Sequence, residues 1–221
     1  MPKPKAAPAG SHSILLVHGI LGQEFVYWNL LKRYLKSDRF HCHEAPFPFF
    51  GFGDLRKSAA HLAQVVDDLL EEAPDEASDG RIDIIAHSAG GLAARYYVKF
   101  LGGDRTVHHL VTLGTPHHGT YFSALFPVAT VVRQTLPGSD FLEELNGGKE
   151  APGPVQYTSI YSPTDGIVVP PSSALLGGAN NVKVVGLTHW GFLWRPKVYK
   201  LIRDVLDHDA PTAPARPKAP R

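Results

Sequence analysis

The sequence has a single cysteine, Cys42, among 221 residues, and no hydrophobic run that approaches the length of a membrane span. One cysteine excludes an intrachain disulfide, so the fold does not depend on an oxidising compartment, and we expect Cys42 to be a small buried apolar residue. The basic N-terminal stretch MPKPKAAPAGSHS lacks the apolar segment of a secretory signal. These absences predict a cytoplasmic protein with no stable membrane insertion.

Charge of one sign is also lacking, because 22 Lys and Arg residues balance 21 Asp and Glu residues for a net charge of +1. No run of basic residues interleaved with aromatic residues is present, which argues against a nucleic-acid partner and favours a small-molecule partner. A hydrophobic content of 43% and a charged content of 19% fit one domain with a buried core. The oligomeric state is left open.

Short apolar runs alternate along the chain with longer segments of helical period, between Pro/Ala-rich tails at 1–12 and 208–221 that we expect to be disordered. This pattern predicts a single α/β domain over 13–207, with an open, mostly parallel sheet of about six strands and helices on both faces. Ligands of such sheets bind at the carboxyl ends of the strands. The expected strands are 13–17, 40–45, 82–86, 108–113, 156–161 and 182–186, and the expected helices are 24–35, 57–71, 89–101 and 191–206.

The segment 120–153 fits this alternation poorly. It is either a cap or insertion over the sheet edge, with apolar positions facing a substrate or the core, or an ordinary pair of crossover helices.

The stretch RIDIIAHSAGGLAARYYVKF, residues 81–100, places a serine between an apolar strand and a helix. Such a junction needs a sharp turn at Ser88, and only small neighbours such as Ala86 and Gly90 fit around that turn. The turn would project the hydroxyl from the sheet edge toward the N–H of Ala89, at a helix N-terminus. The alternative is that Ser88 only caps the helix.

A serine hydroxyl becomes a nucleophile when a histidine takes its proton, and that histidine needs a carboxylate to orient it. His189 follows the last expected strand, and Asp165 follows the strand before it. The chain order Ser, Asp, His, each after a different strand, predicts a catalytic triad of Ser88, Asp165 and His189. Taken alone, Asp165 also fits a plain turn. Asp140 and Glu143 or Glu144 are weaker rivals, because they lie in the possible insertion with no strand before them.

The loop after the first strand, in LLVHGILG, supplies the second candidate donor for an oxyanion. Gly19 lets the backbone bend toward the site, and the N–H of Ile20 would lie opposite that of Ala89. We expect His18 to be a structural hydrogen-bonding residue and His87 to face away from the serine.

Together these residues resemble the α/β-hydrolase lipases and esterases, in particular the small bacterial lipases with A-H-S-x-G in place of G-x-S-x-G. The resemblance spans most of residues 13–189 through four ordered segments: LVHGILG, IDIIAHSAGGLAARYY, VTLGTPHHGT and SPTDGIVVP. It implies triacylglycerol lipase or carboxylesterase activity with the triad and oxyanion hole named above. Many such lipases are secreted, and the missing signal favours an intracellular ester or lipid substrate.

Two aromatic clusters follow expected strands and therefore lie at the edge where ligands bind. The loop APFPFFGFGDL follows the second strand, and THWGFLW surrounds the candidate histidine. We expect a hydrophobic acyl group to be bound by Phe47, Phe49, Phe50, Phe52 and Trp190. The alternative for the phenylalanine loop is a plug packed on the core.

No metal and no cofactor are expected. His117 and His118 are adjacent, so their rings point in different directions, and no Asp/His set at ligand spacing stands out. His41 and His43 alternate along a strand and fit a solvated or hydrogen-bonded pair.

The same triad can serve acyl transfer, or thioester or amide cleavage, because the pocket walls and not the triad select the acceptor. Product analysis with added alcohols or thiols separates these activities. A catalytically silent protein that binds an apolar ligand is the non-enzymatic alternative. Its mark would be a broken triad or a bulky residue at the serine turn, whereas all three triad residues and the small neighbours are in place.

Overall fold

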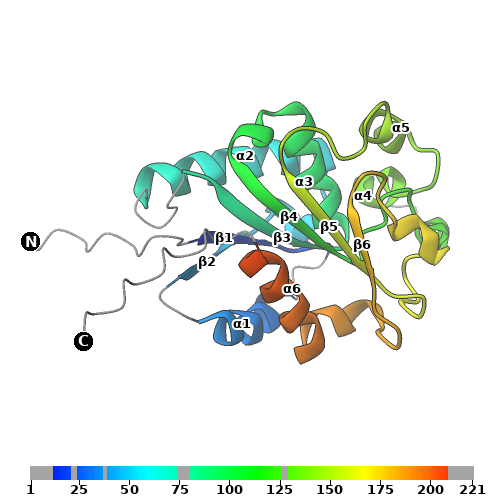
Figure 1. Ribbon diagram of the computed structural model, residues 1–221. Helices are drawn as coiled ribbons and strands as arrows, with labels where there is room; N and C mark the ends of the chain where they lie inside the picture. The colour runs from blue at the N-terminus through cyan, green and yellow to red at the C-terminus, as the bar shows by residue number, and fades with distance from the viewer. Residues whose placement is uncertain (1–11, 21–23, 37–38, 74–79, 126–128, 209–221) are drawn as a thin grey trace, which may run out of the picture.

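The computed structural model describes residues 12–20, 24–36, 39–73, 80–125 and 129–208. Six parallel strands form one open sheet in the order β2-β1-β3-β4-β5-β6 (Figure 1). This confirms the expected sheet. The strands are β1 His12–Val17, β2 Phe40–Ala45, β3 Ile82–His87, β4 Val107–Leu113, β5 Gln156–Tyr161 and β6 Asn180–Lys183.

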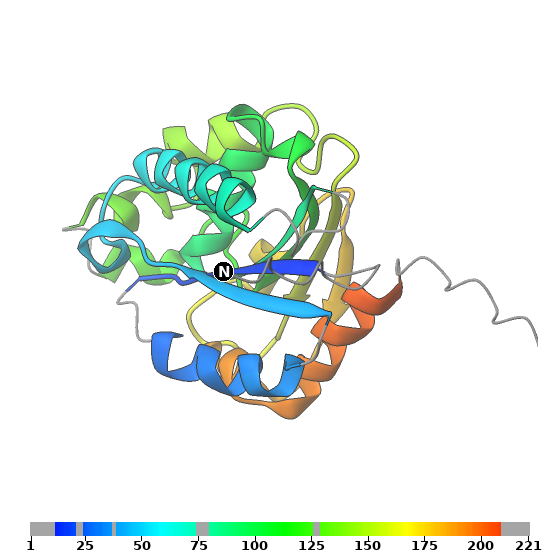
Figure 2. The same cartoon turned by 90° about the vertical axis from the view of Figure 1, so that its left-hand side faces the viewer.

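Helices cover both faces of the sheet, as the alternation predicts (Figure 2). On one face lie α1, Glu24–Leu35, and α6, Pro196–His208, and on the other lie α2, Leu55–Glu72, and α3, Ala89–Phe100 (Figure 1). Side chains of β1 alternate between the two layers: Ile14 and Leu16 join the core under α1 and α6, whereas Leu15 and Val17 join the core under α2 and α3. Alternate residues of a strand point to opposite faces, so a sheet covered twice needs this continuous apolar run.

Two elements near the C-terminus differ from the expected bounds. The last strand pairs over Asn180–Lys183 instead of 182–186, and Gly186, with φ +83°, turns the chain soon after it. The last helix begins at Pro196, because proline is well tolerated at a first helical position but not inside a helix. Residues His189–Leu193 form a separate 3₁₀ turn, η6, which holds the candidate histidine at the sheet edge.

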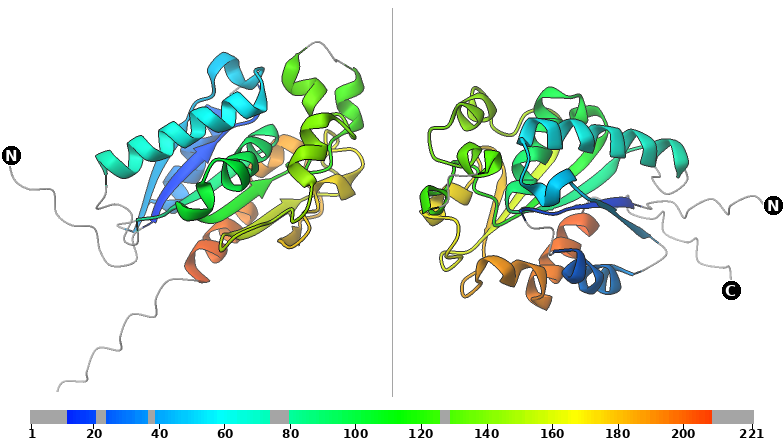
Figure 3. Two further views of the ribbon diagram at one scale, coloured as in Figure 1. Left: turned by 90° about the horizontal axis from the view of Figure 1, so that it is seen from above. Right: turned by 180° about the vertical axis from the view of Figure 1, so that it is seen from behind.

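The described parts of the segment 120–153, residues 120–125 and 129–153, lie beyond the carboxyl ends of the strands and beside α3 (Figure 3). It contains the 3₁₀ turn η4, Tyr121–Leu125, and two short helices, α4, Thr130–Gln134, and α5, Asp140–Asn146. The buried guanidinium of Arg95 joins this segment to α3 by donating to the Oδ1 of Asn146 and the carbonyl of Glu150, each at 3.0 Å. The segment is therefore fastened to the sheet domain at its far end.

The expected tails lie outside the described residues except for His12, which begins β1, and His208, which ends α6. Within the described ranges, no helix is both long enough and apolar enough to cross a membrane. Cys42 is partly buried in β2, and burial raises the pKa of its thiol to about 11. The remaining 3₁₀ turns are η1 Pro48–Gly51, η3 Gly103–Arg105 and η5 Pro171–Ala174.

Candidate active site

Ser88 occupies a strained turn between β3 and α3. Its backbone has φ 54° and ψ −131°, a conformation that L-residues rarely adopt. The turn is held by hydrogen bonds from the Ser88 N–H to the carbonyl of Leu113, at 3.0 Å, and from the Thr115 hydroxyl to the Ser88 carbonyl, at 2.8 Å. The Ser88 side chain makes no hydrogen bond that would cap the helix. The capping alternative therefore does not describe this serine.

The structure brings Ser88, Asp165 and His189 together from loops after three different strands. The Oγ of Ser88 lies 2.9 Å from Nε2 of His189, while Nδ1 of His189 lies 2.9 and 3.0 Å from the two carboxylate oxygens of Asp165. A carboxylate can only accept, so Nδ1 carries the proton and Nε2 is free to accept from the serine hydroxyl. This is the arrangement in which a histidine can take the serine proton.

The carboxylate of Asp165 is buried and fully engaged. Its Oδ1 also accepts the backbone N–H groups of Ile167, at 2.9 Å, and Val168, at 2.8 Å. Burial raises the pKa of Asp165, but the hydrogen bonds from His189 and from these two N–H groups outweigh burial, and the pKa of the carboxyl stays below its ordinary value. The side chain thus both forms the expected turn and holds His189 as an anionic partner.

The loop after β1 packs directly against the start of α3. A Cβ added at Gly90 would lie 2.3 Å from the carbonyl oxygen of His18, so only glycine allows this approach. Ile20 and Ala89 both line the same cavity as Ser88. Ala89 is the first residue of α3, a position whose N–H has no acceptor within the helix. Both predicted oxyanion donors are therefore carried by backbone that borders the serine.

His18 and the phenylalanine loop support the loop after β1. The backbone N–H of Phe47 donates to Nε2 of His18 at 2.9 Å, so Nδ1 carries the proton and donates to the carbonyl of Gly19 at 2.7 Å. Phe47 itself is buried in the core, 5.3 Å from the His18 ring between centroids. His18 is thus the structural hydrogen-bonding residue that the sequence predicts.

The structure separates the residues of the predicted aromatic wall. Among the four of them whose side chains are described, only Trp190 lines the cavity beside Ser88. Phe47 is a core plug, the alternative considered from sequence, while Phe50 and Phe52 are 72% and 39% exposed and do not border the cavity. The side chain of Phe49 lies outside the described residues. The physical reason is that the loop folds back onto the β1 loop, where a Cβ at Gly51 would approach the Gly19 carbonyl to 2.5 Å.

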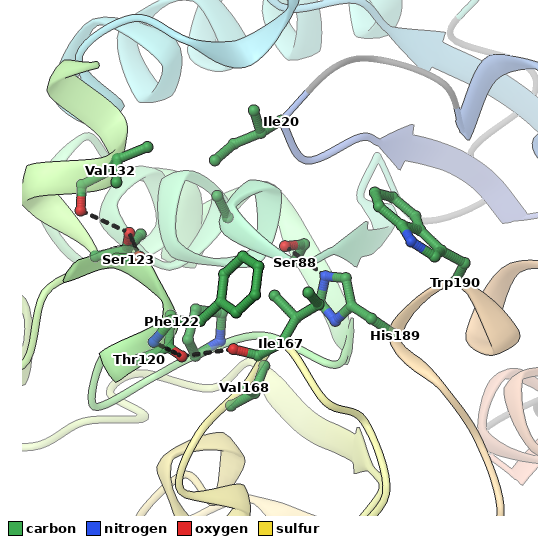
Figure 4. A pocket seen from close by; sticks show the side chains of 13 residues that line it. Ile20, Ser88, Thr120, Phe122, Ser123, Val132, Ile167, Val168, His189 and Trp190 are labelled. Atoms are coloured by element: carbon green, nitrogen blue, oxygen red, sulfur yellow. Dashed lines mark hydrogen bonds between the residues drawn. The ribbon is translucent and has the colours of Figure 1, made fainter. Parts of the chain in front are cut away.

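The walls of the cavity come instead from the loops after β4 and β5. The cavity measures about 180 Å³, and Figure 4 shows Ile20 bordering it from above and Ile167 and Val168 from below. Its polar lining residues are engaged with their neighbours, since Thr120 donates to the carbonyl of Ile167 and Ser123 pairs with the Thr135 hydroxyl at 2.8 Å. What remains for a ligand is an apolar surface, completed by Ala89, Pro116, Phe122 and Val132.

His87 does not simply face away from the site. Its ring is completely buried and lies 4.7 Å from the His189 ring between centroids, and its Nε2 lies 3.1 Å from the carbonyl oxygen of His189. Sequence reasoning missed this contact because His87 and His189 are 102 positions apart in sequence. His117 and His118 separate as expected: His117 is buried against Thr112, whereas His118 faces Glu150 at 2.9 Å.

Comparison with known proteins supports this architecture. Residues 14–149, more than half of the chain, match the model of the family described as palmitoyl protein thioesterase. Lipase B of Aspergillus fumigatus superposes with a TM-score of 0.79 at 22% identity, over 99% of this chain and 57% of the lipase. The mature Bacillus licheniformis lipase gives a TM-score of 0.76 at 16% identity, over 93% of this chain and 96% of the lipase.

A metagenomic carboxyl esterase superposes with a TM-score of 0.67 at 14% identity, over 95% of this chain and 79% of the esterase. The chain thus spans just over half of the Aspergillus lipase but nearly all of the mature Bacillus lipase. At these identities the superpositions establish the α/β-hydrolase fold, and the family follows from the model match. The chain belongs to the palmitoyl protein thioesterase family, and its fold is that of the α/β-hydrolase lipases and esterases.

Proposed function

We propose that the chain is a serine hydrolase that cleaves carboxylic ester bonds of substrates with a hydrophobic acyl group. The observation that carries the proposal is the relay from Ser88 through His189 to Asp165, with contacts of 2.9 to 3.0 Å, opening on an apolar cavity. A silent binding protein has no need of a strained, uncapped serine in contact with a histidine.

In this mechanism the Ser88 hydroxyl attacks the acyl carbonyl while Nε2 of His189 takes its proton. The carbonyl oxygen becomes an oxyanion, which the N–H groups of Ile20 and Ala89 stabilise. The protonated His189 then gives its proton to the departing alcohol, which leaves an ester between the acyl group and Ser88. Water repeats the same steps with His189 as the base, and it releases the acid and the free serine.

The acyl group binds in the cavity between the β4 and β5 loops. Its walls offer methyl, methylene and aromatic carbon, because the hydroxyls of Thr120 and Ser123 are already bonded within the wall. Each methylene buried there contributes about 0.8 kcal/mol, which is roughly fourfold in kcat/KM. Four extra methylenes, from butanoyl to octanoyl, therefore raise kcat/KM by up to about 200-fold if all are buried.

Thioester cleavage is the second candidate, and the family match favours it specifically. Ser88 and His189 can cleave an ester and a thioester by the same steps. A thiolate is a better leaving group than an alkoxide, so thioester cleavage needs no stronger base than ester cleavage. Acyl transfer and amide cleavage remain alternatives for the same triad.

The test uses p-nitrophenyl esters from acetate to palmitate beside thioesters of the same acyl groups, assayed with the native chain and with Ser88→Ala. We expect activity that rises from acetyl to octanoyl and falls by about 10⁴-fold or more in the variant. The ratio of ester to thioester kcat/KM at matched chain length decides between the two candidates.

Two outcomes would reject the proposal. Equal kcat/KM for acetyl and octanoyl esters would show that the cavity does not bind the acyl group. Activity retained in Ser88→Ala would place the chemistry elsewhere. If added alcohols or thiols are recovered as their acyl esters or thioesters, the protein is an acyltransferase instead.

A further inference from the structure

A second polar cluster lies at the opposite end of the sheet from Ser88. Asp83 is the second residue of β3 and only 1% exposed. Three imidazoles approach its carboxylate: His12 from the start of β1, and His108 and His109 from the start of β4. A buried charge is costly unless it is paired, so this carboxylate needs a cation or several donors.

A bulge in β4 places both neighbouring histidines near Asp83. Between β3 and β4 the register runs from Ile82 opposite Val107 to Ile84 opposite Leu110, so two residues of β4 face one residue of β3. In a regular strand His108 and His109 would point to opposite faces. The bulge suspends this alternation, and the two rings lie 4.2 Å apart between centroids. Bulges commonly re-aim side chains toward a site.

The contacts around Asp83 divide into an orienting set and an open set. The orienting set is His109, whose Nδ1 lies 2.8 Å from Oδ1 of Asp83 and whose backbone N–H donates to the same oxygen at 3.1 Å. In the open set, Nδ1 of His12 lies 2.7 Å from Oδ2 of Asp83. Nδ1 of His108 lies 3.9 Å from Oδ1 of Asp83, a longer contact than that of His12 or His109.

The open set fits a divalent transition-metal ion. One ligand atom each from His12, Asp83 and His108 lies within 4.8 Å of the other two. Zinc bonds imidazole nitrogen and carboxylate oxygen at about 2.0–2.2 Å, so an ion bound here would draw these three atoms closer together. A site of this kind also needs a group that orients the ligating carboxylate, which is the role His109 fills.

We propose that His12, Asp83 and His108 bind a zinc-type divalent ion, with His109 orienting the carboxylate. The side chains of His12 and His108 are 10% and 18% exposed, which gives the ion a path and leaves a position for water. This site departs from the expectation of no metal, because the sequence does not reveal the bulge.

The ion would act on stability and not on the ester reaction. Asp83 is the second residue of β3 and Ser88 follows its last residue, so five positions separate them, about 17 Å at the usual rise per residue. The three ligands come from β1, β3 and β4, so the ion would join three neighbouring strands at their amino ends. The proposal is therefore independent of the proposed hydrolase activity.

The experiment is thermal unfolding of the untagged full chain with and without ZnCl₂, after treatment with a chelator. At a hundredfold excess over Kd we expect zinc to raise the Tm of the native chain by about 5–10 °C. His108→Gln is the informative variant, because it removes one proposed ligand and leaves the closer contacts of His12 and His109 with Asp83 in place. Its metal-free Tm should stay within about 2 °C of the native value while the zinc-dependent rise disappears. Asp83→Asn is less useful because it disturbs a buried residue.

His118→Gln is the matched control, because it removes a histidine that faces a carboxylate on the surface, at Glu150. This variant should keep the full zinc response. Calorimetric titration should give one zinc ion per native chain and no ion at this site in His108→Gln. An unchanged Tm of the native chain, or an equal rise in His108→Gln, would overturn the proposal and leave the cluster as a hydrogen-bonded support for β3.

Discussion

Substitution of Gly90 by alanine tests whether the β1 loop stabilises the oxyanion. The added Cβ would lie 2.3 Å from the carbonyl oxygen of His18 and 3.1 Å from that of Val17. Real Cβ contacts are essentially never closer than 3.0 Å, and both neighbours are backbone atoms, so no side-chain rotation relieves the clash. The loop must move by about 0.7 Å, a displacement of the size that disturbs catalytic geometry.

The displaced segment carries the N–H of Ile20. Loss of one such donor lowers kcat by about 10²–10³-fold, equivalent to about 2.7–4 kcal/mol, while KM changes little because the donor acts mainly on the transition state. The fold should lose roughly 1–3 kcal/mol of unfolding free energy from the overpacking. The assay is steady-state hydrolysis of p-nitrophenyl octanoate at 25 °C, with circular dichroism to follow unfolding.

Gly53→Ala is the control, since a Cβ at Gly53 meets no atom within 4 Å. It should leave kcat and KM unchanged. Gly90→Ala could lower the free energy of unfolding, as the clash predicts, and still keep kcat within about threefold of the native value. In that case the β1 loop does not supply the donor, and the reasoning is refuted.

Substitutions at three further positions test the triad, the contact behind His189 and the cavity. Asp165→Asn should lower kcat by about 10⁴-fold in the same assay, because the amide cannot hold His189 in the required tautomer. Because the pKa of Asp165 is lowered in the folded state, its ionised form stabilises the fold above about pH 4. This contribution is lost as the pH falls through the folded pKa. The free energy of unfolding of Asp165→Asn should therefore depend less on pH in this range than that of the native chain. His87→Leu, which removes the group 3.1 Å from the His189 carbonyl, should lower kcat by about tenfold with KM unchanged, and His87→Gln should recover part of that loss. Val132→Phe, which enlarges a side chain in the cavity wall, should lower kcat/KM for octanoyl esters more than for acetyl esters. The control Val185→Phe, on the exposed surface, should change neither value. An equal loss for both esters in Val132→Phe would contradict the acyl site.

Local sequence patterns were enough to predict most of the fold. The bounds of α1, β2 and β5 agree with the expected ranges, because each is a periodic run with a clear end. The order of Ser88, Asp165 and His189 after three strands was also enough to predict that they meet, since the carboxyl ends of parallel strands share one edge. The catalytic roles of these three residues remain predictions.

What the sequence could not reveal depends on register and on loop direction. The bulge that faces His108 and His109 toward Asp83 is a single extra residue in β4, and no periodicity marks it. The cavity walls at Thr120, Phe122 and Val132 come from a segment whose two interpretations were left open, because its short helices have too few turns to show which face is buried.

The phenylalanine loop shows that a location at the sheet edge does not by itself place side chains in the cavity, and its acyl-binding role stays a prediction. Its place after β2 does put it at the functional edge, but the sheet order leaves β1 between β2 and β3. The nearest surface to the loop is therefore the β1 loop, where the N–H of Phe47 holds His18 and His18 holds the Gly19 carbonyl. In a trans peptide the Gly19 carbonyl and the Ile20 N–H point in opposite directions, so fixing one fixes the other. Under the proposed mechanism the aromatic loop supports the oxyanion donor from behind, and we expect changes in Phe47 to alter kcat more than chain-length preference.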